Sequence, residues 1–281
     1  MTVLNIESIA DGALYPDGTM RISYASSVDG YEDWALFLPG DPHRPVIVNI
    51  HGSFSTGDQL YTRQDIRNHF LPVFLRERLN VLTPNLRGTT YMCPKTVVDM
   101  AELLDVVEER FVPDARFIFL SGSGGASSSQ IFAVRHPERV QGLVALGACD
   151  LVDRMEFARQ SPLPVMQDLA RTIIAAYGGT PEELPEVYRA HSDIANKHRL
   201  TMPFLLASGE CDALVPVEKV RLVAETLREQ PGFTYWEVEG GDHDSPLFLP
   251  VEEMLRLVGV EQPARHLVPR CSRHTAATCW R

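Results

Sequence analysis

A short segment rich in glycine and serine constrains this chain most. Residues 121–125 read Ser-Gly-Ser-Gly-Gly, between an apolar run at 117–120 and a helix-forming stretch at 126–134. A strand that turns sharply into a helix needs small residues two positions before and two positions after the residue at the tip. The pattern therefore predicts a nucleophile elbow, with the hydroxyl of Ser123 held clear at a helix N-terminus that favours developing negative charge.

Two other interpretations of this segment exist. A Gly/Ser-rich run is usually a loop or linker, and a phosphate-binding loop would need a lysine that does not follow here. The segment also departs from the usual elbow pattern, because Ser121 stands where glycine is common. The elbow is thus a hypothesis that depends on the rest of the chain.

The composition indicates a large α/β domain and argues against several classes of protein. Of 281 residues, 44% are hydrophobic, which allows a sizeable core. The net charge of −11 argues against nucleic acid as a partner. No apolar run reaches the ~18 residues of a membrane span, and the N-terminus has no secretory pattern. We expect a cytoplasmic protein with no membrane segment.

The cysteines predict neither a disulfide framework nor a metal site. Their count is odd in a large chain, and no Cys-x-x-Cys or His-Glu-x-x-His pair occurs. Four tail residues fit no metal template, and the serine chemistry predicted below requires no metal and no organic cofactor. The cysteines are Cys93, Cys149, Cys211, Cys271 and Cys279, and the tail residues are His266, Cys271, His274 and Cys279.

The order of apolar runs predicts a mostly parallel sheet with helices on both faces. The first forty residues favour antiparallel strands around a turn at 28–30. After residue 45, buried strands alternate with helices, as in βαβ units with right-handed crossovers. Strands are expected at 21–25, 34–38, 46–50, 80–84, 117–120, 140–146, 203–208 and 233–238, and helices at about 63–79, 97–111 and 126–134.

Two segments depart from this alternation. Residues 151–200 are rich in helix formers broken by prolines and predict a small helical insertion over the strand ends, where pockets often form; ordinary connecting helices are the alternative. Residues 261–281 carry four arginines and one acid, so we expect a poorly ordered tail. The main domain is expected to cover residues 1–260.

A serine hydroxyl needs a base to take its proton, and the base needs an acid to orient it. Asp212 is the candidate acid because it follows the strand at 203–208, where α/β sheets build their sites; Glu210 is a weaker alternative. His243 is the candidate base because it follows the strand at 233–238, after two glycines that allow a tight turn. The order Ser, Asp, His matches the order expected after such an elbow.

An oxyanion hole needs two backbone N–H donors. One should come from Gly124, directly after the nucleophile. The other should come from the loop after the strand at 46–50, which reads His-Gly-Ser-Phe at residues 51–54. The sequence leaves open whether Ser53 or Phe54 supplies it.

These motifs resemble the α/β-hydrolase superfamily over about residues 20–258. Within it the chain is most similar to the catalytic domain of the prolyl oligopeptidase (S9) group and to single-domain esterases. Four segments carry the similarity: Asn-Leu-Arg-Gly at 85–88, Tyr-Arg-Ala-His-Ser-Asp-Ile at 188–194, the acid loop at 212–216 and the histidine loop at 240–243. The resemblance implies a hydrolase fold and a Ser-His-Asp triad.

Two departures favour an esterase over a peptidase. The S9 group usually has His-Gly-Gly-Pro or Tyr-Gly-Gly-Pro where this chain has His-Gly-Ser-Phe, and 281 residues leave no room for its β-propeller. We therefore expect cleavage of small carboxylic esters through an acyl-enzyme. A small-peptide or amide hydrolase, a non-catalytic ligand-binding receptor, and an acyl transferase or lyase are the alternatives.

The partner is expected to be a small ester or acyl substrate. The negative charge favours neutral or cationic substrates only weakly, because distant charges are screened beyond ~10 Å at 0.1 M salt. Six side chains are candidates for the pocket, although each is equally expected in the core: Phe54, Tyr61, Tyr91, Met92, Met155 and Phe157.

Overall fold

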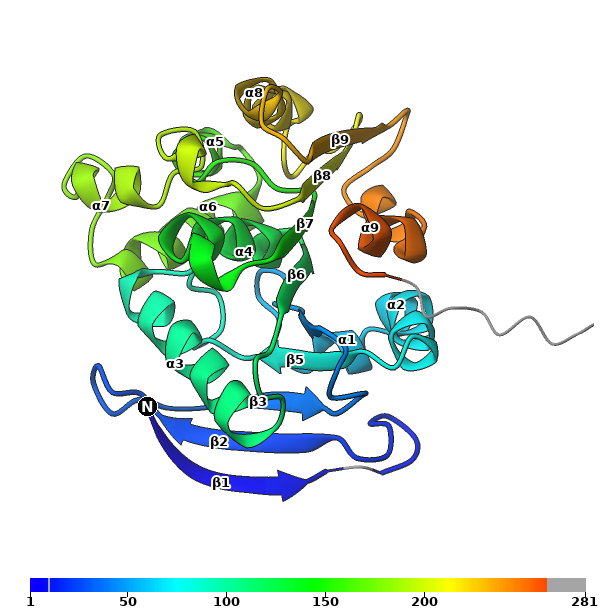
Figure 1. The fold of residues 1–281 in the computed structure, drawn as a ribbon. Coiled ribbons are helices and arrows are strands. Elements are labelled where there is room, and N and C mark those ends of the chain that lie inside the picture. The colour runs from blue at the N-terminus through cyan, green and yellow to red at the C-terminus, as the bar shows by residue number, and fades with distance from the viewer. Residues whose placement is uncertain (10, 262–281) are drawn as a thin grey trace, which may run out of the picture.

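One nine-stranded sheet runs through the residues that the computed structural model describes, 1–9 and 11–261 (Figure 1). Its spatial order is β1-β2-β3-β5-β4-β6-β7-β8-β9. The strands are β1 (Thr2–Ser8), β2 (Met20–Ala25), β3 (Glu32–Leu38), β4 (Val46–Val48), β5 (Asn80–Pro84), β6 (Phe117–Gly122), β7 (Gly142–Leu146), β8 (Phe204–Gly209) and β9 (Phe233–Val238). Almost all of the expected tail lies outside the described residues.

The sheet has an antiparallel edge and a parallel body. Strands β1 to β3 pair antiparallel, and β3 also pairs antiparallel with β5. From β5 to β9 every neighbouring pair is parallel. The predicted mostly parallel sheet is therefore confirmed. The carboxyl ends of the parallel strands meet at one edge of the sheet, where α/β folds build their sites.

Helices cover both faces of the sheet (Figure 1). On one face lie α1, α2 and α9, and on the other lie α3, α4 and α8, with separate apolar clusters beneath them. Along β4 the side chains alternate between these clusters: Val46 and Val48 belong to one and Ile47 to the other. The helices are α1 (Gln59–Thr62), α2 (Gln64–Arg76), α3 (Pro94–Arg110), α4 (Gly124–Arg135), α8 (Val217–Leu227) and α9 (Val251–Leu257).

The segment between β7 and β8 consists mainly of helices. These are α5 (Leu151–Gln160), α6 (Pro164–Tyr177) and α7 (Pro185–Ala190), and short 3₁₀ helices elsewhere are η1 (Pro137–Arg139), η2 (Lys197–Arg199) and η3 (Ser245–Phe248). Pro164 and Pro185 each occupy the first position of a helix, where the missing N–H is not needed. In the described part of the chain no helix has both the length and the apolarity that crossing a membrane requires.

Two strands are shorter than the sequence predicts: the strand expected at 140–146 is β7 at Gly142–Leu146, and the one expected at 46–50 is shorter as well. The strand expected at 46–50 is β4 at Val46–Val48. It ends there because the next two residues form hydrogen bonds that involve side chains. The side chain of Asn49 donates to the Leu120 carbonyl at 2.7 Å, and the backbone N–H of Ile50 donates to the Ser121 hydroxyl at 2.9 Å. Side-chain bonds thus replace the backbone ladder on the β6 side, whereas on the β5 side the Asn49 N–H still donates to the Leu82 carbonyl at 2.9 Å.

Candidate active site

Ser123 lies at a sharp turn between β6 and α4. Its backbone has φ 55° and ψ −127°, a left-handed conformation that residues with a Cβ rarely adopt. A Cβ on Gly125 would collide with the carbonyl of Ile50, so only glycine lets the helix pack so close to the strand. The turn has the strained geometry of a nucleophile elbow, with its serine at the N-terminus of a buried helix.

The structure brings Ser123, His243 and Asp212 together at the carboxyl edge of the sheet. The Nε2 atom of His243 lies 2.9 Å from the Ser123 Oγ, and its Nδ1 lies 2.7 Å from Oδ2 of Asp212. Because a carboxylate only accepts, Nδ1 carries the proton and Nε2 is free to accept the serine proton. The distances are those of ordinary hydrogen bonds.

The loops after β8 and β9 fix this geometry. The side chain of Asp212 is fully buried, and its Oδ1 accepts the backbone N–H groups of Leu214 at 2.7 Å and Val215 at 2.8 Å. The carboxylate therefore has one oxygen left for His243. Glu210, the weaker candidate acid, instead binds the N–H of Gly240 at 2.8 Å and ties the two loops together.

The backbone around the elbow distinguishes the two candidate oxyanion donors. The N–H of Phe54 donates to the Thr89 hydroxyl at 2.6 Å, and Phe54 itself has φ 61°. The N of Ser53, by contrast, would lie 3.0 Å from a Cβ on Gly124. The amides of Gly124 and Ser53 are thus close neighbours, while the Phe54 amide is engaged elsewhere. This geometry favours Ser53 as the second donor.

A cavity of about 290 Å³ opens beside Ser123 and His243. Phe54 contributes to its wall, as the sequence suggested. The other five candidates do not line this cavity: Tyr61, Tyr91, Met92, Met155 and Phe157. Part of the wall comes from residues that the sequence analysis did not single out, on α2, α5, α6 and η3, together with Leu214 of the acid loop: Ile66, Phe70, Arg154, Val165, Met166, Leu169 and Leu247.

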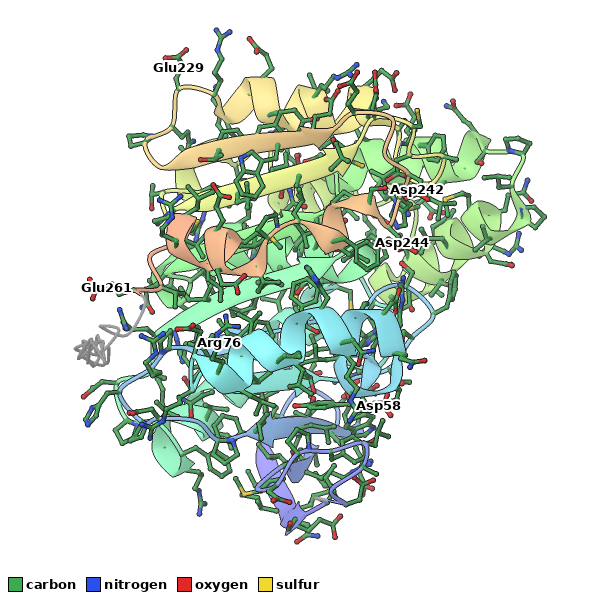
Figure 2. All side chains as sticks on the ribbon, turned by 90° about the vertical axis from the view of Figure 1, so that its right-hand side faces the viewer. Asp58, Arg76, Glu229, Asp242, Asp244 and Glu261 are labelled. Carbon is green, nitrogen blue, oxygen red and sulfur yellow. The ribbon has the colours of Figure 1, made fainter. Side chains whose placement is uncertain are left out.

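Arg63 and Asp244 form a charged pair at this cavity. The guanidinium of Arg63 donates to Asp244 at 2.9 Å and to Asp65 at 2.8 Å. Hydrogen bonding to Arg63 lowers the pKa of Asp65. Figure 2 shows Asp244, Asp242 and Asp58 toward one end of the molecule, with Glu229 and Glu261 at the opposite end. The site therefore occupies the end of the sheet where the loops after the parallel strands gather.

Among the described residues, no group of three or more His, Cys, Asp and Glu side chains lies close enough together to bind a metal ion. The tail residues His266, Cys271, His274 and Cys279 lie outside those residues. The groups that the site itself brings together are a serine hydroxyl, an imidazole and a carboxylate.

Comparison with solved structures shows that the chain has the α/β-hydrolase fold. An esterase from Pyrococcus furiosus matches with a TM-score of 0.60 and 16% identity, over 84% of this chain and 89% of that one. An S-formylglutathione hydrolase from Agrobacterium tumefaciens matches with a TM-score of 0.62 and 16% identity, over 92% of this chain and 100% of that one.

A peptidase domain shares the fold as well. A puromycin-hydrolyzing peptidase from Mycobacterium tuberculosis matches with a TM-score of 0.64 and 17% identity, over 91% of this chain but 41% of that one. No protein-family model and no curated protein matches the sequence. The resemblance to esterases and S9-type catalytic domains is thus confirmed at the level of the fold.

Proposed function

We propose that this protein is a serine hydrolase that cleaves carboxylic esters of small molecules. The observation that carries the proposal is the pair of hydrogen bonds from His243, one to Ser123 at 2.9 Å and one to Asp212 at 2.7 Å. A serine in contact with a base that a buried carboxylate orients is the arrangement that activates a hydroxyl at neutral pH.

The reaction proceeds in two halves. Ser123 Oγ attacks the ester carbonyl while His243 Nε2 takes its proton, and the amides of Gly124 and Ser53 donate to the oxyanion. The bond to the alcohol oxygen breaks as His243 returns the proton to that oxygen, which leaves an acyl-enzyme. Water then attacks the acyl carbonyl, His243 takes its proton, and the bond to Ser123 breaks as the proton returns to Oγ.

The size of the cavity supports a small substrate. About 290 Å³ lies at the low end of the range for ligand sites. The His-Gly-Ser-Phe loop at 51–54 differs from the S9 pattern and supports an ester over a peptide. Cleavage of peptides, acyl transfer, or ligand binding without turnover remain the alternative outcomes of the test below.

Hydrolysis of short-chain 4-nitrophenyl esters tests the proposal. We expect turnover by the wild type and a loss of kcat on the order of 10⁶ in Ser123→Ala, as removal of the serine causes in subtilisin. Ser128→Ala is the matched control, because that buried serine lies on α4 and its hydroxyl donates to the Gly124 carbonyl. Activity that survives Ser123→Ala contradicts the triad. A wild type that cleaves only peptides, or binds without turnover, favours the corresponding alternative.

A further inference from the structure

Arg154 places a positive charge in the wall of the cavity. It lies in the first turn of α5 and is 2% exposed, yet it lines the same cavity as Ser123 and His243. A guanidinium stays protonated in proteins, so the cavity contains a full positive charge. A cation at a helix N-terminus also opposes the helix dipole, so helix stability does not account for this residue.

The partners of Arg154 are neutral. Its Nη1 donates to the backbone carbonyl of Leu214, in the loop that holds the triad acid, and the Tyr91 hydroxyl lies nearby. Its Nε is buried and has no hydrogen-bond partner. Within the described residues no carboxylate lies within 4.0 Å of this guanidinium, and the oxygens of nearby Asp212 already accept other bonds.

A second arginine that lines the same cavity, Arg63, differs from Arg154 because it has carboxylate partners. Arg63 is paired with two carboxylates, Asp65 and Asp244, and its charge is balanced. Buried arginine is rare in folded proteins unless it is paired. A buried donor without a partner costs stability, and the cost is larger when the group is charged. A charge retained under these conditions inside a ligand cavity is suited to an anionic ligand.

We propose that Arg154 binds a carboxylate carried by the substrate, so that the preferred substrates are small esters bearing an anionic group. This inference rests on the proposed function and adds the substrate class. Arginine suits this task because its planar fork matches the two oxygens of a carboxylate. The net charge of −11 does not oppose binding strongly, because charges beyond ~10 Å are screened at 0.1 M salt.

Matched ester pairs test the proposal. The mono-4-nitrophenyl esters of the C4 to C8 dicarboxylic acids are compared with 4-nitrophenyl esters of monocarboxylic acids of equal length. On the alcohol side, 4-carboxyphenyl acetate is compared with phenyl acetate. We expect kcat/KM to be higher for the carboxylate member of at least one pair by about 30-fold or more. The side on which the preference occurs tells whether the acyl or the alcohol part carries the charge.

Variants separate recognition from a structural role. Arg154→Met should abolish the preference, and Arg154→Lys, which keeps the charge without the planar fork, should keep part of it. Arg159→Met is the control, because Arg159 lies on α5 and pairs with exposed Glu182 at 2.5 Å; it should leave the preference unchanged. A loss of kcat/KM that is equal for both members of a pair would indicate a structural role and overturn the proposal.

Binding without turnover distinguishes failure of this inference from failure of the proposed function. Adipate should raise the Tm of the wild type and not that of Arg154→Met. If both members of each ester pair are cleaved at equal kcat/KM and the cleavage requires Ser123, the proposed function stands and the carboxylate site is overturned. If no ester is cleaved but adipate stabilises the wild type alone, the carboxylate site stands and the hydrolase does not. If no ester pair shows a higher kcat/KM for its carboxylate member, and no C4 to C8 dicarboxylate raises the Tm of the wild type, the inference is overturned.

Discussion

The Ser121 hydroxyl accepts the backbone N–H of Ile50 at 2.9 Å and joins the elbow strand to the loop that carries Ser53. Ser129 on α4 donates to the same hydroxyl at 3.0 Å, so three segments meet at one oxygen. Ser121 is 1% exposed, and the serine that departs from the usual elbow pattern therefore has a structural task. It positions the strand end that leads to the proposed oxyanion donor.

Replacing Ser121 by alanine is expected to destabilise the fold. The variant leaves the buried N–H of Ile50 without an acceptor, which lowers the free energy of unfolding by about 1–3 kcal/mol. Urea unfolding measures the difference. Ser27→Ala serves as the control, because the side chain of Ser27 is exposed and loses one hydrogen bond, to Glu102, so that stability should change by no more than about 0.5 kcal/mol. Equal shifts in the two variants would show that the bond to Ile50 contributes little.

Replacing Gly124 by alanine should block the proposed oxyanion site. The new Cβ would collide with the Ser53 hydroxyl and lie 3.0 Å from the Ser53 N, between the two donors. Loss of one such donor lowers kcat by about 10²–10³. Steady-state ester kinetics measure the change, and the Tm of the same variant tells whether it is folded. A folded variant with wild-type kcat would place the oxyanion elsewhere.

Burial of His191 is expected to make stability fall in acid. Desolvation lowers the pKa of this histidine from 6.5 to about 4, and its Nε2 has no partner. Because the folded pKa is depressed, the unfolded chain binds the proton first. The contribution of neutral, buried His191 to the free energy of unfolding is therefore fully present above pH 6.5. It is lost as the pH falls toward 4, and the free energy of unfolding then decreases by about 3 kcal/mol.

The variant His191→Phe isolates this titration. It retains an aromatic ring against Tyr177, which packs edge-on to His191 with ring centroids 5.5 Å apart. Between pH 7 and 4 the free energy of unfolding should fall by less in the variant than in the wild type, as urea titrations at each pH would show. Parallel pH profiles for the two proteins would contradict the assignment.

The triad candidates could be found from the sequence because each follows an apolar strand at a position with its own pattern. Ser123, Asp212 and His243 come after strands that alternate with helices, and a parallel sheet brings those strand ends to one edge. The strands themselves were predictable because buried parallel strands are continuous apolar runs. The roles of these three residues stay proposals until activity is measured.

Other parts of the site could not be predicted from the sequence. The choice between Ser53 and Phe54 depends on the Thr89 hydroxyl, which is 35 residues away in the chain from Phe54 and bonds its amide. Arg154 carries no motif, and a charged residue on a helix is usually exposed. Its burial results from packing of the 151–200 segment against the acid loop, which is a long-range contact without local pattern.

Covalent labelling of the nucleophile tests the central claim most directly. A fluorophosphonate reacts with an activated serine, and peptide mass spectrometry locates the added mass. We expect one label per chain, on Ser123, with none on the neighbouring serines at 127–129 of α4 and none in Ser123→Ala. His243→Ala should label far more slowly, because the serine then lacks its base. A label on another residue, or one that persists in Ser123→Ala, would contradict the assignment of Ser123 as the nucleophile.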